Sequence, residues 1–88
     1  MIEVKKKGQE EFRIKVEEKG ASKEYMVTLE DSYYQDLTRG KVAKEELIEK
    51  SFEFLLKRES KESILSKFNL KIIKSYFPEY EEEIRRAI

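Results

Sequence analysis

The stretch EFRIKVEEKGASKEYMVTL, Glu11–Leu29, decides the fold of this chain. Its apolar residues fall on every second position, first from Phe12 to Val16 and again from Tyr25 to Leu29. A period of two, in residues that are β-branched or aromatic, indicates strands with one buried face. Gly20 lies between the two runs and predicts a turn. We therefore expect antiparallel strands near 11–18 and 23–29.

The same alternation extends toward the N-terminus. Ile2 and Val4 alternate with Glu3 and Lys5, which predicts a further strand near 2–6, and Gly8 separates it from the next. The sequence therefore predicts an N-terminal antiparallel β-meander of two or three strands. We interpret the basic run that ends it, residues 5–7, as a solvated strand end.

From residue 31 onward the hydrophobic period becomes helical. Asp31 or Ser32 can cap a short helix over about 32–39, and Gly40 stands where a helix-ending glycine belongs. The longest predicted helix covers about 43–59, and we expect it to pack on the apolar face of the sheet. Its apolar stripe consists of Val42, Leu47, Ile48, Ser51, Phe52, Leu55 and Leu56.

The last third of the chain predicts three short helices. The first opens at Ser60 or Lys61 and carries Ile64, Leu65 and Phe68. The second covers about 70–77, and Pro78 must end it because proline disfavours a helical residue before it. The third follows Pro78, with Tyr80 and Ile84 on its apolar face. Strands followed by about four helices indicate an α+β fold, with residues 1–88 as a single domain.

The composition excludes much chemistry. The chain has 88 residues, 19 basic and 19 acidic, with no His and no Cys, so Ser–His and Cys–His nucleophiles, disulfides and the common zinc sites are absent. Its three glycines are scattered, which excludes a phosphate-cradling loop. We expect no enzyme, with no catalytic, cofactor-binding or metal-binding residues. No apolar run could span a membrane and no signal peptide is apparent, so the predicted location is the cytoplasm.

Residues 61–77 carry a hint of nucleic-acid binding. Read as two short helices around a tight turn, they resemble a helix-turn-helix, with Lys67, Lys71 and Lys74 as candidate phosphate contacts. Against this, residues 69–77 contain no Arg or Gln for base reading, and the acidic run 79–83 follows at once. The alternative is a pair of core helices with solvated lysines.

Protein contact is the main functional prediction. The C-terminal half is rich in large apolar side chains, and a small scaffold can leave some of them uncovered as a partner surface. Phe54, Tyr76, Phe77 and Tyr80 are the candidate interface residues, and a homodimer is one way to cover them. The alternative is a complete monomeric core.

One resemblance concerns the C-terminal part. The residues Glu62-Ser63-Ile64-Leu65, Phe68 and Leu70, with Tyr76-Phe77-Pro78-Glu79-Tyr80 and Ile84, are similar to a pattern in a family of small uncharacterised prokaryotic proteins. They cover roughly a third of the chain. The resemblance implies a self-standing prokaryotic domain, and it implies no activity, cofactor or binding site.

Overall fold

Three antiparallel strands at the start of the chain form most of a four-stranded sheet. The computed structural model describes all 88 residues, and in it β1 (Ile2–Lys6), β2 (Glu11–Glu18) and β3 (Ala21–Thr28) form the predicted meander. Lys19 and Gly20 both have positive φ, 52° and 77°, so they form the tight two-residue turn that suits the twist of a hairpin.

The fourth strand differs from the prediction. β4 (Lys67–Asn69) lies parallel to β3 at the edge of the sheet, where a helix containing Phe68 was expected. Residues 60–66 form turns and irregular structure instead of a helix. Three backbone or side-chain groups of β3 bind this segment, as described below, and those bonds replace the ones that a helix would make within itself.

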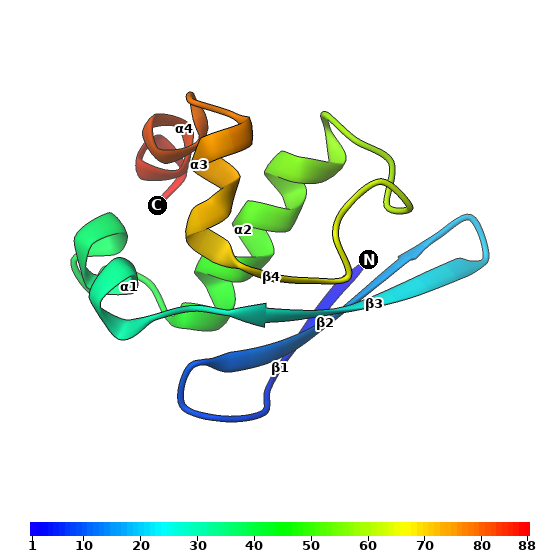
Figure 1. The fold of residues 1–88 in the computed structure, drawn as a ribbon, viewed down its shortest axis with the longest axis horizontal. Helices are drawn as coiled ribbons and strands as arrows, with labels where there is room; N and C mark the ends of the chain where they lie inside the picture. The colour runs from blue at the N-terminus through cyan, green and yellow to red at the C-terminus, as the bar shows by residue number, and fades with distance from the viewer.

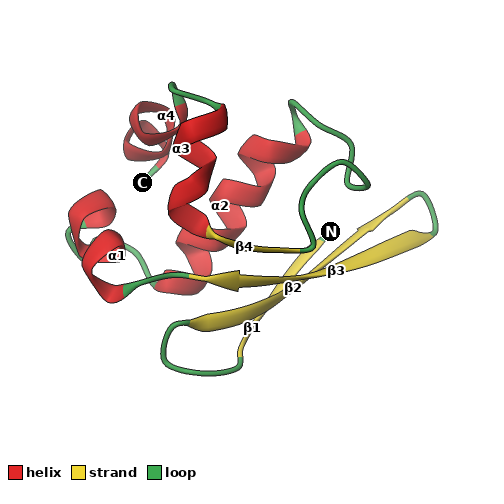
Figure 2. Cartoon of the chain, in the orientation of Figure 1, coloured by secondary structure: helices red, strands yellow, loops and turns green.

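The helices follow the sheet and cover one of its faces. Figure 1 shows α2, α3 and α4 on the same side of the sheet, with α1 beside the end where β3 finishes. Figure 2 shows the other face of the sheet without a helix on it. The elements are α1 (Asp31–Thr38), α2 (Lys44–Leu56), the 3₁₀ turn η1 (Leu70–Ile72), α3 (Ile73–Tyr76) and α4 (Tyr80–Ala87).

The helix ends show which local predictions hold. α1 begins at Asp31, but neither predicted side chain caps it, since Glu30 holds the N-cap position and the Asp31 N–H donates at 2.9 Å to the carboxylate of Glu10 in the loop before β2. Gly40 follows the left-handed Arg39 at the end of α1, as predicted. Phe77, before Pro78, is extended and ends α3, and α4 then begins at Tyr80.

The core lies between the sheet and α2. Alternate residues of β2 and β3 are fully buried, while those between them face solvent or are half-buried. The buried side chains of the sheet are Phe12, Ile14, Val16, Tyr25 and Val27, and those of α2 are Leu47, Ile48, Ser51, Phe52, Phe54 and Leu55. The stripe predicted for the longest helix is therefore confirmed from Leu47 to Leu55, whereas Val42 lies before the helix and, like Leu56, is only half-buried, and the helix is shorter at both ends than predicted.

Candidate functional site

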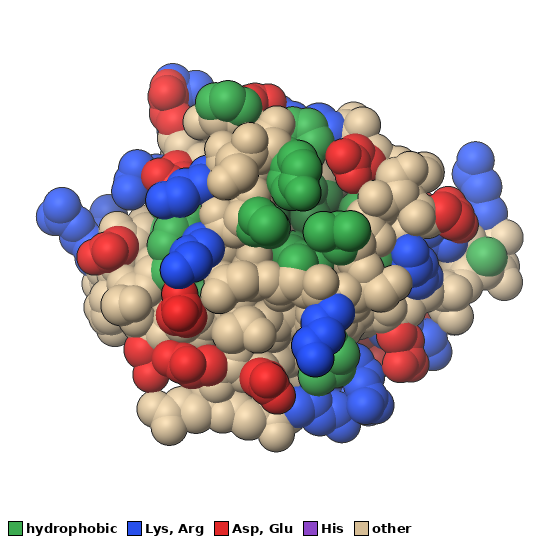
Figure 3. Space-filling view, in the orientation of Figure 1, with side chains coloured by type: hydrophobic (Ala, Val, Ile, Leu, Met, Phe, Trp, Pro, Cys, Tyr) green, Lys and Arg blue, Asp and Glu red, His purple; other side chains and the backbone are tan.

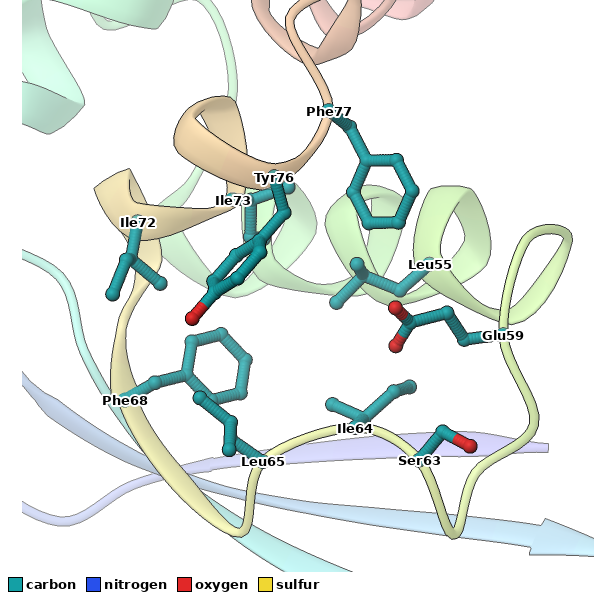
Figure 4. Close-up of a pocket in the computed structure, with 10 residues that line it drawn as sticks. All are labelled: Leu55, Glu59, Ser63, Ile64, Leu65, Phe68, Ile72, Ile73, Tyr76 and Phe77. Carbon is teal, nitrogen blue, oxygen red and sulfur yellow. The ribbon is translucent and has the colours of Figure 1, made fainter.

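An apolar pocket of about 170 Å³ opens on the helical side of the molecule, beside β4. Eight of the ten residues that line it are hydrophobic, and in Figure 3 the apolar side chains gather there on an otherwise mixed surface. Figure 4 shows the walls, which come from the end of α2, the loop after it, β4, η1 and α3. The lining residues are Leu55, Glu59, Ser63, Ile64, Leu65, Phe68, Ile72, Ile73, Tyr76 and Phe77.

The pocket has a buried floor and an exposed apolar rim. Leu55, Ile64 and Ile73 are buried and belong to the core. On the rim, Leu65 is 52% exposed, Ile72 36% and Tyr76 63%. Apart from Met1, these three are the exposed large hydrophobic residues of the whole chain. Since single exposed apolar residues are ordinary but a contiguous group is not, this rim is the most distinctive surface of the molecule.

Bonds from β3 hold the loop wall of the pocket in place. The Tyr25 hydroxyl donates to the Lys61 carbonyl at 2.5 Å, and the Met26 N–H donates to the Ser66 carbonyl at 2.8 Å. The Lys23 ammonium donates to the carbonyls of Glu62 and Ile64 at 3.4 and 3.3 Å. The loop therefore has a fixed course although it has no regular secondary structure.

Burial, reinforced by nearby negative charge, raises the pKa of Tyr25 to about 12. Its hydroxyl therefore stays protonated through the neutral range and keeps donating to the loop.

Two polar side chains interrupt the apolar lining. Figure 4 shows the carboxylate of Glu59 pointing toward the pocket, and no Lys or Arg nitrogen lies within 4.0 Å of it. The Ser63 hydroxyl lies 3.0 Å from that of Ser60. The pocket can therefore receive an apolar side chain and offers one unpaired negative charge at its edge.

The four predicted interface residues fall into two places. Tyr76 and Phe77 line the pocket. Phe54 and Tyr80 are buried, with ring centroids 5.2 Å apart, and the Arg58 guanidinium stacks 3.6 Å from the Phe54 ring centroid. The last two therefore stabilise the contact between α2 and α4 instead of forming a surface.

Sequence reasoning missed Leu65 and Ile72 as surface residues. The predicted helix that opens at Ser60 or Lys61 carries Ile64 and Leu65 alike as apolar residues, so the pattern does not assign one to the core and the other to the surface. In the loop the two side chains separate, because Ile64 points into the core and Leu65 is exposed on the rim. No signal in the sequence distinguishes the two.

The helix-turn-helix prediction for residues 61–77 is wrong. The first helix is absent, and the second is reduced to η1 and the four-residue α3. Lys67 lies on β4, whereas Lys71 and Lys74 pair with Glu30 at 3.0 Å and with Glu81 at 3.7 Å. No recognition helix therefore presents these three lysines together.

Nowhere do three or more acidic side chains come together in a way that could hold a metal ion. None of the helices has the length and apolar character that crossing a membrane requires. The exposed apolar rim around a concave apolar floor makes the pocket beside β4 the candidate functional site.

No protein-family model, curated protein or solved structure matches this chain. The resemblance of its C-terminal part to a family of small prokaryotic proteins accordingly stays a prediction.

Proposed function

We propose that this chain is a small non-enzymatic protein-interaction module, whose pocket beside β4 receives an apolar side chain of a partner protein. The observation that carries the proposal is the exposed apolar rim of Leu65, Ile72 and Tyr76 around a concave apolar floor. Full burial of one Leu or Ile side chain contributes about 1.5–3 kcal/mol, and aromatic residues in such pockets often dominate binding.

The charge at the pocket indicates the chemistry of the partner segment. Glu59 is the only ionisable side chain among the lining residues apart from Tyr76, and it has no cationic partner in the chain. A cationic group next to the inserted apolar side chain would pair with it, whereas an acidic group would be repelled. The proposed ligand is therefore a segment with an apolar residue adjacent to Lys or Arg.

Two small probes test this chemistry directly. We expect phenethylammonium to shift the backbone amide NMR signals of the lining residues at lower concentration than 3-phenylpropionate does. Glu59→Gln, which keeps the shape of the side chain, should remove the preference for the cation. Equal shifts from both probes in the unmodified protein would refute the role of Glu59.

A macromolecular partner is identified by a photo-crosslinker placed at position 76, with the same group at the exposed Ser22 as the control. A protein captured from position 76 alone is then measured for affinity. Leu65→Asp should weaken its binding at least about tenfold, whereas Ser22→Asp, which adds the same charge elsewhere, should not. If both variants bind like the unmodified protein, the pocket is not the binding surface.

A further inference from the structure

The free edge of β1 is a second surface without a partner, at the side of the sheet away from β4. β1 pairs with β2 through its odd-numbered residues, because Met1 and Glu17 exchange two backbone bonds and the Lys7 N–H donates to the Glu11 carbonyl. In an antiparallel ladder, bonded and non-bonded pairs alternate. The N–H and C=O groups of Ile2, Val4 and Lys6 therefore point away from the sheet, and no backbone or side-chain group of the chain binds them.

We infer that a second copy of this chain adds to this edge, β1 against β1, to form one continuous sheet across a two-fold axis at Val4. Two bonds join the central Val4 residues, and two more join each Ile2 to Lys6 of the partner subunit. Every one of the outward-facing groups is then satisfied. β-Strand addition of this kind draws its affinity from such main-chain bonds.

Charge complementarity selects a second copy over another strand. Centred on Val4, the pairing places Glu3 directly opposite Lys5 of the partner subunit, and Lys5 opposite Glu3 of the partner subunit. These are non-hydrogen-bonded positions, where cross-strand side chains lie closest. The strand Ile2–Lys6 is thus complementary in charge to its own reversed copy.

In the monomer Lys5 faces a like charge on β2, and a second copy would bring an opposite charge next to it. In the β1–β2 ladder Lys5 lies directly opposite Arg13, and Arg13 approaches Glu24 at 4.0 Å while Lys5 forms no ion pair. Like charges directly opposite one another destabilise a sheet. Glu3 of the partner subunit supplies the counter-charge that Lys5 lacks.

The contact is one strand wide, so its affinity should be modest. Interfaces well below about 1,200 Å² belong to weak and transient complexes. We expect self-association that becomes visible by analytical ultracentrifugation between about 10 μM and about 1 mM protein. A monomeric mass over that whole range would overturn the inference.

Charge exchange tests the register. Glu3→Lys and Lys5→Glu should each weaken the dimer about tenfold or more, and the double variant should restore it. A general change in monomer stability would not give this pattern, because Glu3→Lys places a like charge opposite Lys15 while Lys5→Glu places an opposite charge across from Arg13. If the double variant remains monomeric, the proposed register is wrong.

Proline substitution tests the edge itself. Val4→Pro removes one outward N–H and leaves the bonds to β2 in place, so it should abolish self-association with an unchanged circular dichroism spectrum. A Val4→Pro variant that is folded and still dimerises would show that another surface is used. If it fails to fold, the charge-exchange series decides.

Discussion

At the scale of single residues, the hydroxyls of Ser51 and Tyr80 form a hydrogen bond between two fully buried side chains of the core. They lie 2.6 Å apart, and the Ser51 hydroxyl also donates to the Leu47 carbonyl at 2.8 Å. Since the serine proton is used there, the Tyr80 hydroxyl must donate to Ser51. Burial raises the pKa of Tyr80, which keeps it a donor. The hydrogen bond therefore runs from the Tyr80 donor on α4 to the Ser51 acceptor on α2.

Because Tyr80 is the donor, removing the Ser51 hydroxyl and removing the Tyr80 hydroxyl should lower the free energy of unfolding by different amounts. Ser51→Ala leaves the buried Tyr80 donor without an acceptor and should lower the free energy of unfolding by about 1–3 kcal/mol. Tyr80→Phe removes the donor itself while Ser51 keeps Leu47, so it should cost less. Denaturant unfolding of both variants and of the double variant measures the coupling. Equal costs would contradict the assigned donor.

At the scale of elements, the loop over residues 60–66 depends on β3 for its course. Tyr25→Phe removes the bond to the Lys61 carbonyl. We expect faster amide hydrogen exchange in residues 60–66 of this variant, with exchange in the middle of α2 unchanged. Uniformly faster exchange would mean that Tyr25 stabilises the whole fold and not this wall of the pocket.

The same bond predicts a loss of stability at alkaline pH. The pKa of Tyr25 is about 12 in the folded protein and near its ordinary value of 10.0 when unfolded, so folding favours the neutral hydroxyl. Its contribution is complete below pH 10 and is lost as pH rises toward 12. Denaturant unfolding across this range should show a shallower decline for Tyr25→Phe than for the unmodified protein. An identical decline would contradict the shift.

An ion pair between Asp31 at the start of α1 and Lys44 at the start of α2 predicts a loss of stability at acidic pH. The hydrogen bond from Lys44, aided by one from Gln9, lowers the pKa of Asp31 below its ordinary value of 3.8. The charged form therefore stabilises the fold above that value, and its contribution is lost as pH falls below it. Asp31→Asn should make the decline in stability below pH 4 shallower, while Glu62 and Glu79, whose pKa values are also lowered, keep part of it.

Element by element, the sequence predicts what depends on local pattern. The alternation from Phe12 to Leu29 gives β2 and β3, and Pro78 sets the break before α4. β4 depends on a parallel bond from Met26 to Ser66, forty residues away, which no local pattern encodes. The serines at 60, 63 and 66 also compete for local hydrogen bonds and weaken the predicted helix. Because neither β4 nor the loop before it was predicted, the pocket that they line was not predicted either.

At the scale of the whole molecule, the two proposed surfaces lie at opposite edges of one sheet. The strand order β1-β2-β3-β4 separates the free edge of β1 from the pocket beside β4 by three strand spacings, about 14 Å. A continuous sheet built through β1 would therefore leave both pockets open. The dimer would then carry two equivalent binding sites, which favours partners with several copies of the ligand segment.

This separation predicts that each surface can be removed without the other. Leu65→Asp should leave the self-association measured by ultracentrifugation unchanged, and Val4→Pro should leave the NMR shifts caused by phenethylammonium unchanged, because neither side chain borders the other surface. The alternative is a dimer formed through the pocket itself, with Tyr76 and Phe77 at its centre. In that case Leu65→Asp would produce monomers and Val4→Pro would not, since a charge in an apolar contact costs far more than one lost edge bond. The pair of variants thus decides which edge of the sheet joins two chains.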